Sequence, residues 1–168
     1  LRHAQPLVAP GVCYGASDVA ADPAATGQAA LAWCKTLPPG ARVISSPLQR
    51  CTDLAKRLCE LRPDVPWHID PRLAELEFGR WEGRPWDQID RAELEAWTSD
   101  FSHWRCGGGE CVHDVMTRVA GVWDEARCDA RPQVWVTHAG VIRATSLLAQ
   151  GLRQVSRADQ WPVAAPAF

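Results

Sequence analysis

The chain has 168 residues, of which 46% are hydrophobic and 23% charged, and its formal net charge is −2. This length and composition predict one globular domain with a substantial buried core. The near-neutral charge and the scattered basic residues argue against a nucleic-acid or membrane partner, and no apolar run approaches the roughly 20 residues of a membrane span.

The first third of the chain alternates loops with short regular elements. Leu1-Arg2-His3 puts an apolar residue directly before a charged pair, as expected where a buried strand passes into a loop. Residues 6–22 are rich in Pro, Gly and Ala and predict a loop. A helix is predicted from Thr26 to about Leu37, then a buried strand over residues 42–45. Ser46-Pro47 predicts the cap and first-turn proline of a helix that runs to Pro63.

The second part of the chain loses its periodicity and then regains it. Residues 66–70 predict a weak strand. Between residues 72 and 109, tryptophans lie among acidic residues, and Gly107-Gly108-Gly109 predicts a hinge. Residues 112–126 carry an apolar stripe typical of a helix, residues 133–137 are the clearest strand, and residues 141–152 predict a last helix. We expect residues 1–168 to form a single domain in which 72–109 is a lid-like insertion.

Strands that alternate with helices predict an α/β fold, here a three-layer α/β/α architecture with a mainly parallel central sheet. The predicted strands end at His3, Ser45 and His138. Because ligands of such folds bind beyond the carboxyl ends of the strands, these residues should meet at one edge of the sheet.

The side chains expected at that edge suit a tetrahedral dianion. Arg2 follows the first strand, and Arg50 lies in the first turn of the helix after Ser46-Pro47. The backbone amides of Ala139 and Gly140 open the last helix. Arginine forks and a helix N-terminus together bind phosphate groups well.

Two histidines in such a pocket indicate catalysis. One neutral imidazole can attack phosphorus, provided that a hydrogen bond holds its far nitrogen as N–H, and the other can stabilise charge on the phosphoryl oxygens. The departing alkoxide also needs a proton donor. Glu75, Glu77 and Glu82 are the candidate acids.

These residues stand in an order that resembles the histidine phosphatase superfamily, which has the phosphoglycerate-mutase-like fold. That family has Arg-His-Gly after its first strand, then Ser-Ser-Pro-Leu-x-Arg-Ala, Leu-x-Glu with Gly-x-Trp-Glu-Gly, and finally Thr-His-Gly-Gly. The resemblance spans residues 1 to about 152. The corresponding segments of this chain are Arg2-His3-Ala4, Ser45-Ser46-Pro47-Leu48-Gln49-Arg50-Cys51, Leu73-Ala74-Glu75, Gly79-Arg80-Trp81-Glu82-Gly83 and Thr137-His138-Ala139-Gly140.

The resemblance implies a role for each matched position. His3 would be the phosphorylated nucleophile and Glu75 the proton donor, and Arg2, Arg50 and His138 would hold the phosphoryl group. Three departures are visible. Alanine replaces glycine at Ala4 and Ala139, which narrows the space near the phosphate. The asparagine that often follows the first motif is missing, since Pro6-Leu7-Val8 stands there, and with it one phosphate contact.

A narrower resemblance concerns the substrate. The loop Gly11-Val12-Cys13-Tyr14-Gly15, followed by Asp18, resembles that of α-ribazole-5′-phosphate phosphatases of cobalamin synthesis. It implies a phosphomonoesterase for a small-molecule ester, with Cys13 and Tyr14 at the substrate entrance. Two alternatives are phosphoryl transfer of the phosphoglycerate-mutase type and a phosphate-binding domain without turnover. The sequence indicates no oligomeric state.

A metal site is the remaining alternative, because the spacing of His103, Cys106, Cys111 and His113 imitates a zinc site. His113, however, falls in the first turn of a predicted helix, and the resemblance instead implies a Gly-Glu pair near the site entrance. We therefore expect no metal and no cofactor.

The cysteines indicate the cellular compartment. Seven cysteines are an odd number scattered through periodic segments, which indicates reduced thiols. With no signal peptide visible, we expect a cytoplasmic protein.

The chain begins without methionine and stops abruptly at Ala167-Phe168, so we expect residues to be missing at both ends.

Overall fold

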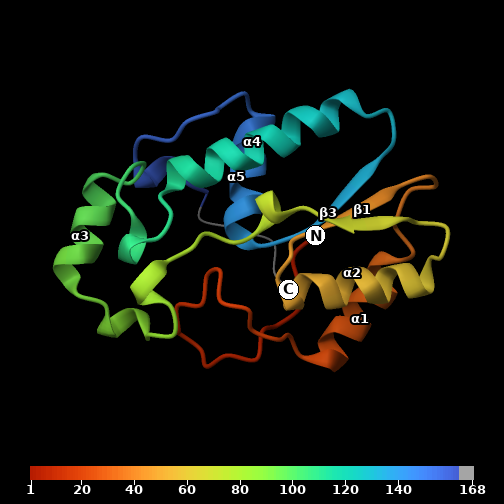
Figure 1. Ribbon diagram of the computed structural model, residues 1–168, viewed down its shortest axis with the longest axis horizontal. Helices are drawn as coiled ribbons and strands as arrows, with labels where there is room; N and C mark the ends of the chain where they lie inside the picture. Colours follow the sequence, from red (N-terminus) through yellow and green to blue (C-terminus); the bar gives the residue numbers. More distant parts are fainter. Residues whose placement is uncertain (163–168) are drawn as a thin grey trace.

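The computed structural model describes residues 1–162 and contains a parallel sheet at its centre (Figure 1). Within those residues the strands are β1 (Arg42–Ser45), β2 (Trp67–Ile69) and β3 (Gln133–Val136), in the order β2-β1-β3. Val43 pairs with Trp67 on one side and with Val134 on the other, both in parallel register. The strands predicted over residues 42–45, 66–70 and 133–137 are confirmed. The strand expected to end at His3 is instead a single parallel bridge between Arg2 and Thr137.

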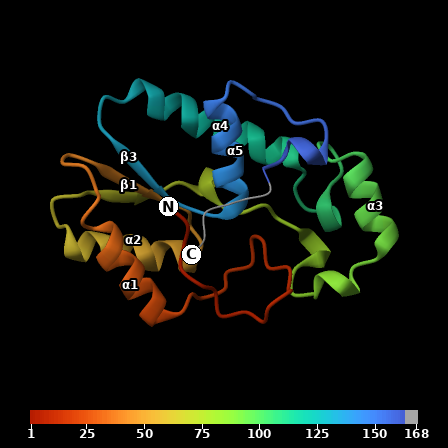
Figure 2. The same ribbon diagram turned by 180° about the vertical axis from the view of Figure 1, so that it is seen from behind.

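Helices cover both faces of this sheet, as the two opposite views show (Figures 1 and 2). On one side lie α1 (Pro23–Trp33) and α2 (Gln49–Leu61), and on the other lie α4 (Val112–Cys128) and α5 (Ala139–Ala149). The buried face of α2 packs with Val43 and Val136, whereas the stripe of α4 packs with α5. The predicted three-layer α/β/α architecture is confirmed.

The starts of α1 and α2 differ from the sequence prediction. Helix α1 begins at Pro23, because the Asp22 carboxylate accepts a hydrogen bond from the Ala25 amide at 2.7 Å. Thr26 therefore lies inside the helix. Helix α2 begins at Gln49, two residues after the expected proline. The carboxylate of Asp18, in the loop over residues 6–22, accepts a hydrogen bond from the Gln49 amide at 2.6 Å.

Residues 72–109 form short turns and one helix, α3 (Arg91–Ser99), which lies at the end of the molecule away from β1 and β3 (Figure 1). Their aromatic side chains join the core against α4, with Trp81 completely buried. Short 3-10 turns punctuate this segment, and another lies near the chain end: η1 (Pro71–Leu73), η2 (Gly79–Trp81), η3 (Trp86–Gln88), η4 (Cys106–Gly108) and η5 (Ala158–Gln160). That residues 72–109 act as a lid stays a prediction.

The glycine run at 107–109 serves close packing, where the sequence suggested a hinge. A Cβ on Gly109 would stand 2.3 Å from the Glu77 carbonyl oxygen, and one on Gly107 would stand 2.1 Å from that of Phe78. Gly107 also has a φ of +56°, which favours glycine. The glycines therefore let the backbone of residues 107–109 pack directly against that of residues 77–78, shortly after Glu75.

Within residues 1–162, none of the helices is both long enough and apolar enough to cross a membrane.

Candidate active site

The start of the chain continues the sheet and thereby brings two distant histidines together. Arg2 forms a parallel bridge with Thr137, and the His3 amide donates to the Thr137 carbonyl oxygen at 3.2 Å. His138 follows directly at the start of α5. The imidazole centroids of His3 and His138 lie 5.1 Å apart, with the rings tilted by 55°.

A backbone contact fixes the tautomer of His3. Its Nδ1 lies 2.7 Å from the Ala4 carbonyl oxygen. Since a carbonyl can only accept, Nδ1 carries the hydrogen and Nε2 of the neutral ring keeps its lone pair. The residue is 1% exposed. Burial, assisted by the charges of Arg50 and Arg2, lowers the pKa of His3 to about 4, against the opposing effect of the Ala4 hydrogen bond.

His138 is buried even more completely and contacts the start of α2. Its Nε2 lies 2.7 Å from the Ser46 hydroxyl oxygen and 3.4 Å from Sγ of Cys51. Burial, then the Arg50 cation and His3, hold the pKa of His138 well below its usual range. Burial also raises the pKa of the Cys51 thiol to about 12, so this sulfur stays protonated. Both imidazoles are thus neutral at pH 7, and a negative charge beside them would favour protonation.

Arg50 brings a buried cation to the same place. Its guanidinium donates to the carbonyl oxygens of Gly15 at 2.6 Å and Ser17 at 2.7 Å. Its Nε is buried and finds no hydrogen-bond acceptor within residues 1–162. The side chain is 0% exposed, so this N–H is a donor available to an anion.

Glu75 meets the start of α5 from the other side. Its two carboxylate oxygens each lie 3.2 Å from the Gly140 amide nitrogen, and one also accepts from the Leu76 amide at 3.1 Å. A Cβ at Gly140 would come within 2.3 Å of a Glu75 oxygen. The carboxylate can therefore lie against the start of α5 because residue 140 has no side chain.

These groups adjoin a pocket of about 640 Å³. Its lining includes five of the predicted site residues, namely Arg2, Cys13, Tyr14, Glu75 and Ala139 at the start of α5. Another part of the lining, the aromatic wall, consists of Phe78, Trp86, Trp97, Phe101 and Trp161. His3, Arg50 and His138 are buried and do not belong to the lining.

The predicted entrance residues lie at this pocket in different ways. Tyr14 contributes its ring, which stands 5.2 Å from the guanidinium carbon of Arg50. Cys13 also lines the pocket but is 1% exposed, and burial raises the pKa of its thiol to about 12. Its amide and carbonyl pair with Arg84 and Gly83. Cys13 therefore holds the loop in place through its backbone, and its side chain is buried.

Two residues near the site escape the sequence analysis. Ser46 contacts His138, and Arg143 lines the pocket one turn after Gly140 on α5. A signal for Arg143 exists, since it is a charged residue in an otherwise uncharged helix, three positions after the Thr-His-Ala-Gly turn. The sequence assigns Ser46 to capping, and its distant partner leaves no local trace.

Glu77 and Glu82, the other candidate acids, do not belong to the pocket lining. The Glu77 backbone pairs with that of Glu110. The Glu82 carboxylate accepts from the amides of Ala16 at 2.8 Å and Phe78 at 2.9 Å, which ties the entrance loop to residue 78.

The zinc alternative finds no cluster in the part of the chain that the structure describes. Among residues 1–162, no three His, Cys, Asp or Glu side chains approach closely enough to hold a metal ion. His103 and His113 do face each other with centroids 5.1 Å apart, but Cys106 and Cys111 are buried in the core region.

Comparison with known proteins adds a family match and several relatives. The family model of the histidine phosphatase superfamily (branch 1) matches residues 1–165. Glucosyl-3-phosphoglycerate phosphatase of Mycolicibacterium vanbaalenii is 34% identical over 72% of this chain and 56% of its own length. Adenosylcobalamin/alpha-ribazole phosphatase of Salmonella typhimurium is 33% identical over 71% of this chain and 60% of its own length. The chain thus spans little more than half the length of these curated relatives.

Solved structures agree with the fold. A mycobacterial glucosyl-3-phosphoglycerate phosphatase in complex with inorganic phosphate superposes with a TM-score of 0.80 and 27% identity, over 99% of this chain and 83% of that one. A protein from Thermus thermophilus gives a TM-score of 0.67 and 31% identity, over 90% of this chain and 83% of that one.

Proposed function

The chain belongs to branch 1 of the histidine phosphatase superfamily, and from this membership we propose that it hydrolyses a small-molecule phosphate monoester through a phosphohistidine. One observation carries the proposal: two neutral, buried imidazoles lie 5.1 Å apart beside the buried Arg50 cation, whose Nε–H meets no acceptor among residues 1–162. This combination suits a phosphoryl group held between the rings and stabilised by positive charge.

His3 is the nucleophile in this proposal. Its Nε2 lone pair attacks phosphorus, an N–P bond forms, and the ester P–O bond breaks. Water then attacks phosphorus, the N–P bond breaks, and inorganic phosphate leaves.

Arg2, Arg50, His138 and the Ala139 amide hold the phosphoryl oxygens. Arg2 lies at the pocket and Arg50 offers its buried Nε–H. The Ala139 amide is one of the donors in the first turn of α5 that have no partner within the helix, and the helix dipole there also favours negative charge. A dianion at this point favours protonation of His138, which then stabilises the charge that develops on phosphorus.

Glu75 transfers the protons. It protonates the leaving alkoxide as the P–O bond breaks, and its carboxylate then takes a proton from the attacking water. Its place at the pocket, against the Gly140 amide, supports this role. The arginines and this single carboxylate require no metal ion for the reaction.

The aromatic wall supports a substrate whose alcohol carries a flat ring, since aromatic faces stack on such rings. α-Ribazole 5′-phosphate is an ester of this kind, and the Salmonella relatives carry its name. The mycobacterial relatives are named for a sugar ester. All seven cysteines are free thiols, which supports a reducing compartment and hence the cytoplasm.

A substrate panel tests the function. The protein is incubated with α-ribazole 5′-phosphate, glucosyl-3-phosphoglycerate or 3-phosphoglycerate, with and without bisphosphoglycerate, and inorganic phosphate, isomerised ester and bound ester are measured. We expect phosphate release, with the highest kcat/KM on the aromatic ester. A preference for the sugar ester would contradict the substrate proposal alone. Phosphoryl transfer that depends on bisphosphoglycerate would indicate a mutase, and binding without turnover a phosphate-binding domain.

A further inference from the structure

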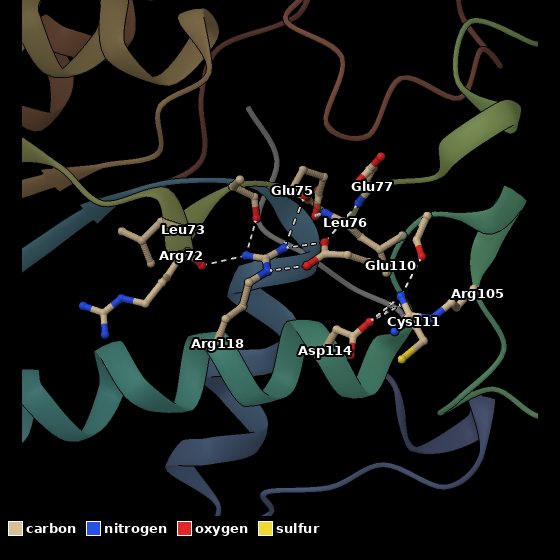
Figure 3. Close-up of polar contacts among 12 residues, drawn as sticks. Arg72, Leu73, Glu75, Leu76, Glu77, Arg105, Glu110, Cys111, Asp114 and Arg118 are labelled. Carbon is tan, nitrogen blue, oxygen red and sulfur yellow. Dashed lines mark hydrogen bonds and ion pairs between the residues drawn. The ribbon is translucent and has the colours of Figure 1, made fainter.

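Arg118 reaches from α4 to the segment that carries Glu75 (Figure 3). Its Nη1 donates to the carbonyl oxygens of Arg72 at 2.6 Å and Ala74 at 2.7 Å, and its Nη2 contacts that of Glu75 at 3.3 Å. The side chain is only 17% exposed. One guanidinium therefore contacts three backbone carbonyl groups in the segment 72–75.

Glu110 contacts both Arg118 and the backbone just after Glu75. Its carboxylate accepts from Nε and Nη2 of Arg118 at 2.8 and 3.0 Å, and also from the Glu77 amide at 3.1 Å. The Glu110 amide in turn donates to the Glu77 carbonyl oxygen at 2.8 Å. The pair thus binds the backbone on both sides of Glu75, as the dashed contacts in Figure 3 show.

Glu75 depends on such contacts because its segment has no regular structure. Residues 75–78 belong to neither a helix nor a strand. No continuous ladder of backbone hydrogen bonds runs along them, so side-chain contacts carry a larger share of their positioning. A bidentate arginine–carboxylate pair that is largely buried supplies contacts of this strength and direction.

We propose that Arg118 and Glu110 are positioning residues that hold the Glu75 carboxylate against the Gly140 amide, where it can protonate the leaving group. The proposal rests on the function proposed above. Neither residue lines the pocket, and each acts through the backbone of residues 72–77. Displacement of this segment would move the carboxylate, while His3, Arg50 and His138 would remain in place on other elements.

The test compares two substrates that differ in their need for a proton donor. An alkyl phosphate needs its leaving oxygen protonated, whereas p-nitrophenyl phosphate does not, since p-nitrophenolate is stable. A displaced Glu75 should therefore lower kcat/KM for the alkyl ester selectively. A purely structural defect should lower both values equally.

Four variants give the comparison. Glu110→Gln keeps the size but weakens the pair with Arg118, and Arg118→Lys keeps the charge but cannot span three carbonyls and a carboxylate. Glu75→Gln removes the proton donor itself. Glu125→Gln is the matched control, because Glu125 also lies on α4 and pairs with Arg72 of the same segment, at 2.6 Å, but is 65% exposed.

We expect the alkyl-to-nitrophenyl ratio of kcat/KM to fall about 100-fold in Glu75→Gln, which is within the usual contribution of a general acid. It should fall about 10-fold in Glu110→Gln and Arg118→Lys, as for a donor that is displaced but present, and stay unchanged in Glu125→Gln. Equal losses on both substrates in both pair variants, with a selective Glu75→Gln, would overturn the positioning role alone. A Glu75→Gln enzyme with equal losses would overturn the proton-donor role and the positioning role with it.

If Arg118→Lys does not fold, Glu110→Gln decides the matter, because it leaves Arg118 with its backbone carbonyl partners. In that variant, phosphorylation of the protein by p-nitrophenyl phosphate should proceed at the wild-type rate. A slowed rate would contradict the proposal, since it would mean that the nucleophile had also moved.

Discussion

At the residue scale, the reactivity of His3 follows from one hydrogen bond and its burial. The Ala4 carbonyl takes the Nδ1 hydrogen at 2.7 Å and so leaves the lone pair on Nε2. Burial lowers the pKa from the ordinary value of 6.5 to about 4, so the ring is neutral at physiological pH. A nucleophile that carries no proton needs no separate base in the first step.

The same burial predicts how stability depends on pH. Between pH 6.5 and about 4, the unfolded chain binds a proton at His3 that the folded protein does not. Stability from this residue is therefore complete above pH 6.5 and is lost as the pH falls. His3→Gln should reduce the fall in unfolding free energy between pH 7.5 and 5 by about 2 kcal/mol, as measured by urea denaturation. An unchanged fall would show that His3 does not titrate in this way.

At the element scale, α2 carries Arg50 and is capped by a residue from outside the motif. The Asp18 carboxylate accepts from the Gln49 amide at 2.6 Å, while the N-cap residue Leu48 has no side chain able to do so. Asp18 therefore links the entrance loop to the helix that presents Arg50.

Loss of this cap has a measurable cost. Asp18→Ala should destabilise the protein by about 1 kcal/mol, which lowers Tm by about 2–4 °C for a domain of this size. Glu60→Ala on the same helix is the control, since Glu60 makes only an exposed ion pair with Arg57. Equal Tm values for Asp18→Ala and the wild-type protein would contradict the capping role.

The sequence predicts elements best where local composition determines them. Residues 42–45 and 133–137 are short apolar runs between loops, and the strands β1 and β3 lie there. The predicted start of α1 is wrong because Asp22-Pro23, a cap followed by a first-turn proline, stands outside the apolar stripe.

The candidate site is predictable in part for the same reason. Its motifs place His3 and His138 after predicted strands and Arg50 in the first turn of a helix, and the structure brings the three together. The contacts of Arg118 and Ser46 join residues far apart in the chain. Such pairs leave no periodicity or spacing in the sequence, so only the folded chain reveals them.

At the scale of the whole molecule, positive charge is concentrated where the formal charge of −2 gives no hint of it. Arg2 and Arg50 both act on His3 through their charges, and Arg2, Arg143 and the N-terminus of α5 line the pocket beside it. This cationic donor set attracts a phosphate dianion and repels a divalent metal ion.

Metal independence follows as a prediction. Activity should be unchanged after dialysis against EDTA and should be blocked by vanadate, which adopts the five-coordinate geometry of the transferred phosphoryl group. Both are measured as inorganic phosphate release from the preferred ester. Loss of activity in EDTA that zinc or magnesium restores would contradict the prediction.

The central claim is a covalent phosphohistidine on His3, and direct detection of that bond tests it best. Protein quenched in alkali during turnover of a ³²P-labelled ester should carry label that is stable to base, labile to acid and located on the peptide that contains His3. His3→Ala and His3→Gln, checked for folding by circular dichroism, should carry none and release no phosphate. Label that persists in these variants, or wild-type turnover without any labelled protein, would contradict the account.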